Sequence, residues 1–212
     1  MRTIILDLGL NNLNSVKKAF TENSGQNDSV EVISEYIHLT SPALLILPGL
    51  GKFAAAMTVI REKRFDILIN ENRVLNGCVA GICLGMQLLM SGSEESPGVK
   101  GLSLIAGTAR RLKANSEEQR VPNIGWNSTI VKDAANLFPS LGDEKDFYFV
   151  HSYAVEAYDE KNVLATTPYG TSFFTSAILA NGILGFQFHP EKSSSAGATL
   201  IREILEWAKL EI

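Results

Sequence analysis

Apolar runs and amphipathic segments alternate along the first half of the chain. Two runs rich in β-forming residues, 3–8 and 30–34, lie on either side of a segment over 12–20 whose apolar residues recur at helical spacing. Asparagines ahead of this segment are candidate helix caps. Strands that alternate with helices predict parallel strands joined by crossover helices. The buried face of the predicted helix consists of Leu13, Val16 and Phe20.

The stretch "ALLILPGLG" at 43–51 is a continuous apolar run that ends in proline and glycine. Such a run is typical of a central strand that is buried on both faces and followed by a tight turn. A helical stretch is expected next, within 54–75. The run "CVAGICLGMQLLM" at 78–90 begins like a buried strand and finishes like a helix, which places a turn between Gly81 and Gly85.

The second half of the chain has a different pattern. From about residue 103 onward, short apolar runs separated by turns indicate hairpins rather than crossover units. The tail "SAGATLIREILEWAKL" predicts a long helix. The chain is therefore expected to form an α/β fold with a single-domain open mixed sheet and flanking helices. The short runs are "IAGTARRL", "STIV", "FYFV", "VLATTPYG", "FFTSAIL" and "ILGFQF", and the buried stripe of the tail helix is Leu200, Ile204, Leu205 and Ala208.

Composition and charge narrow the class of protein. The chain has 212 residues, 45% of them apolar, which suffices for the core of one compact domain over 1–212. Its net charge is −4, and its lysines and arginines are scattered, so no nucleic-acid partner is expected. No apolar run reaches the ~18 residues of a membrane span, and the start "MRTIILDLGL" is unlike a signal peptide. We therefore expect no membrane partner and a cytoplasmic location.

The two cysteines, Cys78 and Cys83, are expected to be free thiols, because their spacing is not that of a C-x-x-C redox motif. Cys83 is the centre of the segment "GICLG", where a strand passes directly into a helix. This pattern is typical of a nucleophile elbow, in which flanking glycines let a substrate approach the thiol and the helix N-terminus favours the thiolate. The alternative is a small buried apolar residue, which is the interpretation that we give to Cys78.

The stretch "GFQFHPEKS" at 185–193 places His189 and Glu191 two residues apart. When a thiolate attacks a carboxamide, one imidazole can protonate the departing ammonia and then activate water. Glu191 would fix the tautomer and the orientation of the ring. A structural histidine at a strand end is the alternative. His151 is a second candidate base, but only His189 has a carboxylate at the expected offset.

The segment "LPGLGKF" at 47–53 places two glycines at the end of a central strand, where an open α/β sheet has its binding crevice. A backbone N–H from the Gly49–Leu50–Gly51 segment, together with the N–H of Leu84 after the nucleophile, would form an oxyanion hole. A glycine-rich turn without a functional role is the alternative.

The motifs "GICLGMQLL", "LPGLGKF" and "GFQFHPEKS" together resemble those of class I glutamine amidotransferases. The resemblance implies a flavodoxin-like architecture and a catalytic triad of Cys83, His189 and Glu191. More narrowly, "VPNIGWN" (121–127), "FYFVHSY" (147–153) and the opening "LDLGLNNLNSVKKAF" resemble the glutaminase subunits of imidazole glycerol phosphate synthases. Asn11 stands where that family usually has a second glycine, but asparagine also tolerates a left-handed backbone.

The same resemblance implies hydrolysis of L-glutamine through a thioester on Cys83, with ammonia passed to a cyclase subunit that has a (βα)₈-barrel fold. It implies a heterodimer and neither a cofactor nor a metal. Gln87 and Ser152 would contact the glutamine, and the residues that face the cyclase would be Trp126, Tyr148 and Lys192. The glutaminase subunit of anthranilate or aminodeoxychorismate synthase is an alternative, and a non-catalytic regulatory subunit is another.

Overall fold

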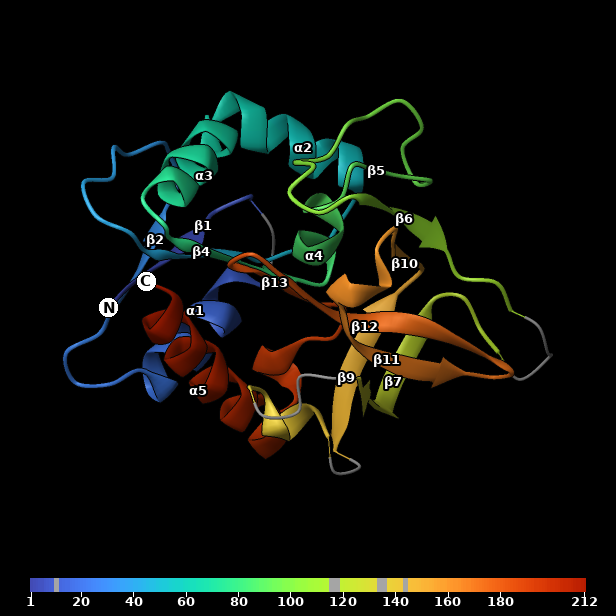
Figure 1. Cartoon of the computed structure of the whole chain (residues 1–212). Coiled ribbons are helices and arrows are strands. Elements are labelled where there is room, and N and C mark those ends of the chain that lie inside the picture. The colour runs from blue at the N-terminus through green and yellow to red at the C-terminus, as the bar shows by residue number, and fades with distance from the viewer. Residues whose placement is uncertain (10–11, 115–118, 133–136, 143–144) are drawn as a thin grey trace.

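The computed structural model describes residues 1–9, 12–114, 119–132, 137–142 and 145–212 (Figure 1). Asn11, the departure from the family pattern, lies outside these residues. Strands and helices alternate through the first half as predicted. Its elements are β1 (Arg2–Leu6), α1 (Leu13–Asn23), β2 (Ser29–Ile33), β3 (Leu44–Leu47), α2 (Phe53–Glu62), α3 (Phe65–Val74), β4 (Cys78–Ile82) and α4 (Leu84–Leu88).

The second half consists mainly of strands and closes with the predicted C-terminal helix. The strands are β5 (Gly92–Ser93), β6 (Gly107–Arg111), β7 (Asn123–Ser128), β8 (Ile130–Val131), β9 (Asp146–His151), β10 (Tyr153–Ala157), β11 (Val163–Tyr169), β12 (Ser172–Ala180) and β13 (Ile183–Phe186). The remaining elements are the 3₁₀ turns η1 (Pro139–Leu141), η2 (Glu160–Asn162) and η3 (Pro190–Lys192) and the helix α5 (Ser194–Glu211).

A mixed sheet of 11 strands forms the centre of the molecule, with the order β2-β1-β3-β4-β13-β12-β10-β6-β5, and with β11 paired to β12 and β8 paired to β11. The five strands from β2 to β13 pair in parallel, whereas β13 and β12 are antiparallel. Strands β7 and β9 form a separate antiparallel sheet. The predicted single-domain open mixed sheet with flanking helices is therefore present, and its parallel half has the arrangement that crossover helices produce.

Helices cover both faces of the parallel half (Figure 1). Alternate residues of a strand point to opposite faces, so Ile5 packs in one apolar cluster with α1 and α5, and Ile4 packs in the other with α2, α3 and α4. The predicted core residues Val16 and Phe20 of α1 are buried, and Leu13 packs at the edge of the first cluster. The predicted stripe of α5 is also buried.

Two details of the helices differ from the sequence-based expectation. The stretch expected within 54–75 forms two helices, because Arg64 has a left-handed backbone with φ 58° that separates α2 from α3. Asn12 is at the N-cap position of α1, yet its side chain makes no capping hydrogen bond. Its amide is used elsewhere, as described below.

The hairpins predicted for the second half are found in β11–β12 and β12–β13. The strand in "ILGFQF", β13, also pairs in parallel with β4, so it belongs to both halves of the sheet. The runs predicted from the sequence missed β5, β7 and β10. No helix in the described part of the chain is long and apolar enough to cross a membrane.

Candidate active site

Three neighbouring strands end at the same edge of the sheet and bring the predicted motifs together. β4 lies between β3 and β13 and pairs in parallel with both. The segment "PGLG" follows β3, Cys83 follows β4, and the stretch from Gln187 to Glu191 follows β13. Parallel strands place their carboxyl ends side by side, so residues more than 100 positions apart in sequence meet at one crevice.

Cys83 is at the predicted strand-to-helix turn, between β4 and α4. Its φ of 54° and ψ of −108° are strained for a residue with a side chain. The backbone is held by the Cys83 N–H, which donates to the Phe186 carbonyl at 2.7 Å. The turn also needs glycine at position 85, because an added Cβ would lie 1.8 Å from the Leu47 carbonyl oxygen. The two glycines of "GICLG" therefore permit close packing, and α4 begins immediately after the thiol.

Cys78, the other cysteine, lies inside β4 and is buried in the apolar core. Both cysteines are free thiols, as expected. Burial raises the pKa of the Cys78 thiol to about 12, with a smaller effect of the Glu211 carboxylate. Cys78 therefore remains a neutral thiol at physiological pH.

His189 and Glu191 form a buried pair beside Cys83. His189 Nδ1 lies 2.8 Å from Glu191 Oε1, and both side chains are inaccessible to solvent. The Asn12 amide donates to the same carboxylate oxygen at 3.2 Å. The carboxylate is thus held by a residue 179 positions earlier in the chain. Because Glu191 fixes Nδ1, the free ring nitrogen is Nε2.

Two opposing effects act on the protonation of His189. Burial lowers its pKa, but the negative charge of the nearby Cys83 thiolate and the contact with Glu191 outweigh burial and raise the pKa to about 10. When the Cys83 sulfur is negatively charged, His189 is therefore favoured as the imidazolium near neutral pH. An imidazolium next to the thiolate is the form that can donate a proton to a leaving group.

His151, the alternative base, is held in a different way. Its Nδ1 donates to the Tyr153 carbonyl at 2.9 Å, and its Nε2 accepts from the Asn123 amide at 3.2 Å. Burial, with a contribution from the charge of His189, lowers the pKa of His151 to about 4. Both ring nitrogens are occupied and the ring is neutral, so His151 is poorly placed to carry a proton.

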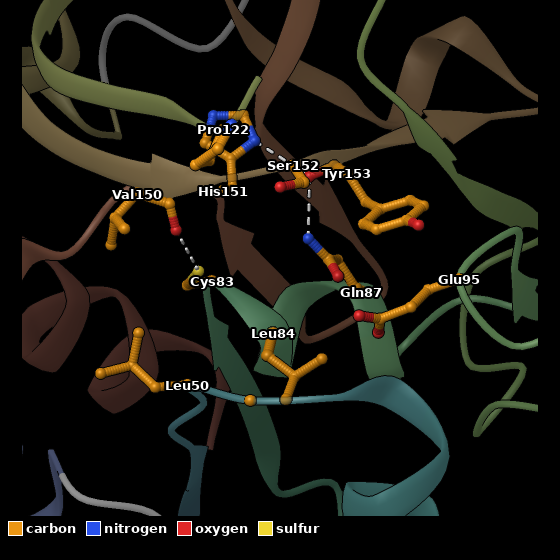
Figure 2. Close-up of a pocket in the computed structure, with 11 residues that line it drawn as sticks. Leu50, Cys83, Leu84, Gln87, Glu95, Pro122, Val150, His151, Ser152 and Tyr153 are labelled. Carbon is orange, nitrogen blue, oxygen red and sulfur yellow. Dashed lines mark hydrogen bonds between the residues drawn. The ribbon is translucent and has the colours of Figure 1, made fainter. Parts of the chain in front are cut away.

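A pocket of about 280 Å³ opens in front of Cys83 (Figure 2). Of the six residues expected to contact substrate, Leu50, Gly51, Leu84, Gln87 and Ser152 line it. Gly49 does not. It packs behind the pocket, where an added Cβ would lie 2.5 Å from Leu84 Cβ and 2.7 Å from Gly85 N.

His189 is also absent from the pocket wall, because it is fully buried behind the thiol. Cys83 is consequently the member of the candidate triad that faces the pocket (Figure 2). Its Sγ is close to strand β9, where it donates a long hydrogen bond to the Val150 carbonyl at 3.8 Å. The described residues contain no group of three His, Cys, Asp or Glu side chains that could hold a metal ion.

The three residues expected to face a partner lie near one another outside the pocket. Trp126 of β7 and Tyr148 of β9 are cross-strand neighbours with an edge-to-face contact of 5.8 Å between ring centroids. Trp126 is 50% exposed. Lys192 is exposed at the end of η3. The His189 N–H donates to the Tyr148 carbonyl at 2.9 Å, so the outer residues adjoin the buried pair.

The sequence matches the family described as Glutamine amidotransferase class-I over residues 4–206. The chain belongs to the class-I glutamine amidotransferase family. It is 41% identical over 212 residues to the imidazole glycerol phosphate synthase subunit HisH 2 of Vibrio vulnificus, covering 100% of this chain and 97% of that protein. It is 44% identical over 163 residues to the subunit HisH of Thermotoga maritima, covering 77% of this chain and 75% of that protein.

A similar fold occurs in the solved structure of PurLQS from Thermotoga maritima, with a TM-score of 0.70 at 18% identity and coverage of 97% of this chain and 98% of that one. At this identity the likeness shows only the fold. The class-I glutamine amidotransferase fold thus agrees with the architecture predicted from the sequence.

Sequence reasoning missed three polar residues near the site of this amidotransferase. Glu95 lines the pocket and accepts the Phe53 N–H at 2.7 Å, which fixes the start of α2. Asn12 holds Glu191, although the sequence indicated only a helix cap. Gln187 donates to Cys83 Sγ at 3.6 Å. Gln187 alone had an available signal, because it stands two residues before His189 in a motif already singled out.

Proposed function

We propose that this chain hydrolyses L-glutamine to glutamate and ammonia as the glutaminase subunit of a cytoplasmic imidazole glycerol phosphate synthase, and delivers the ammonia to a cyclase subunit for histidine biosynthesis. The observation that carries the proposal is the thiol of Cys83 at a strained elbow beside the buried His189–Glu191 pair. The similarity to HisH subunits over the full chain supports the choice of pathway.

The reaction has two halves. The Cys83 thiolate attacks the side-chain carbonyl carbon of glutamine, and the electron pair of the C=O bond moves to oxygen. His189 gives its proton to the amide nitrogen, the C–N bond breaks, and ammonia departs. A γ-glutamyl thioester then remains on Cys83. Water then attacks the thioester while His189 takes its proton, and glutamate departs as the C–S bond breaks. The high pKa of His189 suits the first proton transfer.

The pocket contains groups that match the ends of a glutamine molecule. The oxyanion would meet the N–H of Leu84, which begins α4 and has no intrahelical acceptor, and an N–H of the Leu50–Gly51 segment. Glu95 is the carboxylate among the lining residues, so it suits the α-ammonium group of the substrate. Gln87 and Ser152 line the same pocket and offer polar atoms to the remaining groups.

The partner surface that we propose is the outer face of the β7–β9 sheet. Alternate residues put Ile124 and Trp126 on this face, 61% and 50% exposed, with Val150 and Tyr148 opposite them on β9. An exposed apolar face of this kind indicates a protein interface. Val150 also lines the pocket. A (βα)₈-barrel cyclase docked here in a heterodimer would therefore receive ammonia close to its source.

The test is glutamate release from glutamine, measured for the isolated chain and for the chain mixed with a ligand-loaded barrel cyclase. We expect slow hydrolysis alone and strong stimulation in the complex. Cys83→Ala should abolish activity and Cys78→Ala, the matched control, should retain it. Stimulation by an anthranilate or aminodeoxychorismate synthase partner instead would reassign the pathway, and an active Cys83→Ala would remove the proposed nucleophile.

A further inference from the structure

Gln187 is a fully buried carboxamide at the centre of the site. It follows β13, and its backbone N–H donates to the Ser176 carbonyl at 2.9 Å. Its side chain reaches back under the elbow, where Nε2 lies 3.6 Å from Cys83 Sγ. Its Oε1 accepts a hydrogen bond from Gln87 Nε2 at 3.2 Å. The side chain therefore contacts both the candidate nucleophile and a pocket residue.

A chain of hydrogen bonds determines which end of the Gln187 amide faces the sulfur. The Tyr153 carbonyl can only accept, so Gln87 must turn its NH₂ group toward that carbonyl, 2.9 Å away. The same NH₂ group is the one next to Gln187, which must then present its oxygen. The NH₂ group of Gln187 consequently points at Cys83 Sγ. The orientation follows from a backbone carbonyl and not from an arbitrary choice of amide flip.

We propose that Gln187 is a further catalytic residue, whose amide N–H stabilises the thiolate of Cys83 and holds its sulfur in line with the pocket. This inference rests on the proposed glutaminase function. In the neutral thiol, Sγ donates its proton to the Val150 carbonyl. In the thiolate, the S–H donor is lost, whereas the hydrogen bond from the Gln187 N–H to Sγ remains. This bond becomes stronger, because hydrogen bonds to charged groups are stronger than those between neutral groups. The contact therefore favours the charged nucleophile.

The inference also changes the expected role of Gln87. The NH₂ group of Gln87 donates to the Tyr153 carbonyl and to Gln187 Oε1. Gln87 therefore offers its side-chain oxygen to a substrate in the pocket (Figure 2). Gln87 thus acts on the nucleophile indirectly, as a positioning residue that sets the orientation of Gln187.

The experiment uses the Cys78→Ala chain, in which Cys83 is the remaining cysteine. The rate of alkylation by iodoacetamide is measured against pH for this chain and for versions that also carry Gln187→Met or Gln187→Leu. Both substitutions fill the buried space with an apolar side chain and remove the N–H donor. Ser176→Ala is the control, because it alters a buried neighbour on β12 and leaves the amide in place. Far-UV circular dichroism and a thermal melt show whether each variant is folded.

We expect the midpoint of the curve of alkylation rate against pH to move to higher pH in both Gln187 variants. The midpoint should stay in place in Ser176→Ala. In the complex with a cyclase, kcat should fall about 10- to 100-fold with little change in KM, since a hydrogen bond to a charged group is lost. An unchanged midpoint in a folded Gln187 variant would overturn the inference. A shifted midpoint in a chain that never hydrolyses glutamine would support the contact and reject the proposed function instead.

Discussion

His189 and His151 are both buried near Cys83, and their partners give them opposite protonation states. Burial alone lowers the pKa of each ring. His189 gains the thiolate and Glu191 as compensating negative charges, whereas His151 gains only neutral hydrogen-bond partners. The division of roles between two histidines in one site thus follows from charge and not from exposure.

The low pKa of His151 makes folding stability dependent on pH. Between pH 6.5 and about 4, the unfolded chain binds a proton at His151 that the folded chain does not bind. Stability should therefore fall as the pH is lowered through this range, by about 1.4 kcal/mol per pH unit from this residue. His189 adds no slope there, because its pKa is raised and it is protonated in both states below pH 6.5.

Urea unfolding between pH 6.5 and 5 measures this slope. His151→Asn is the comparison, because asparagine keeps a donor for the Tyr153 carbonyl and does not titrate. The slope should be shallower in this variant. An equal slope in the two proteins would mean that another group binds the proton.

The contacts of Glu191 predict an order of activities among three variants and the unmodified chain. His189→Ala should lower kcat most, because it removes the proton carrier, by up to about 10⁶-fold as in comparable triads. Glu191→Gln keeps the shape and weakens orientation and charge, so a smaller loss of about 10²- to 10⁴-fold is expected. Asn12→Ala removes one hydrogen bond to the carboxylate and should cost less again, about 10-fold.

These losses are measured as kcat for glutamate release in the cyclase complex. Folded variants in which Glu191→Gln loses as much as His189→Ala would indicate a direct chemical role for the carboxylate.

At the scale of single residues, the sequence predicted the site residues that lie within recognisable motifs. It missed the residues that reach the site only in the folded chain. Cys83, His189 and Glu191 stand in recognisable segments. Asn12 reaches Glu191 only because β1 and β13 belong to the same sheet and α1 follows β1. No spacing in the sequence contains that information.

Among the elements, the segment after β3 and the first turn of α4 are packed closely enough to act as one unit. Gly49 lies against Leu84 and Gly85 with no room for a methyl group. The same segment continues into Gly51, whose φ of 136° favours glycine. The backbone between these two glycines is where the oxyanion donor is expected.

Gly49→Ala should therefore reduce catalysis more than binding. The added Cβ would lie 2.5 Å from Leu84 Cβ, so the segment must move away from α4. Loss of one aligned oxyanion donor costs about 10²- to 10³-fold in kcat. Steady-state kinetics of the cyclase complex give kcat and KM separately.

Gly92→Ala is the matched control, because its added Cβ would meet only the Val99 carbonyl oxygen at 3.6 Å. This variant should keep nearly full activity. If Gly49→Ala raised KM and left kcat unchanged, the segment would bind substrate rather than the oxyanion.

Elements with a strong period or a continuous apolar run were predicted correctly, as in β3, β4 and α5. The break between α2 and α3 at Arg64 was not predicted, because arginine is not a residue type that favours a left-handed backbone. β7 was missed since "NIGWNS" contains glycine and asparagine and exposes its apolar residues. β7 is a strand because it pairs with β9, although its own residues have a low β-propensity.

The whole molecule has a covered half and an uncovered edge. Helices protect the parallel half of the sheet on both faces, whereas the β7–β9 sheet lies beside the β11–β12 hairpin away from α2 and α3 (Figure 1). Its inner face packs Phe147 and Phe149 against Phe188, and its outer face is the apolar surface proposed for the cyclase. The site therefore lies where the molecule is least enclosed by its own helices.

Trp126→Ala should weaken the complex with the cyclase without affecting the free chain. A buried tryptophan at an interface typically costs 2 kcal/mol or more when it is truncated, which is a loss of about 30-fold or more in affinity. Isothermal titration calorimetry measures the dissociation constant. Tyr158→Ala is the control, because Tyr158 is another exposed aromatic side chain, which follows β10 instead of lying in β7 or β9. Equal effects of the two substitutions would remove the β7–β9 face as the docking surface.

The strand β9 holds Cys83 through the Val150 carbonyl and His189 through the Tyr148 carbonyl, and it presents the Tyr148 ring to the outside. Any coupling between the two binding equilibria that β9 transmits must be reciprocal. If the cyclase tightens the binding of glutamine about tenfold, glutamine must tighten the binding of the cyclase by the same factor. The Cys83→Ala chain should bind glutamine without consuming it, so its affinity for the cyclase with and without glutamine measures that factor. A stimulation confined to kcat would leave the two affinities equal, because reciprocity does not extend to rate constants.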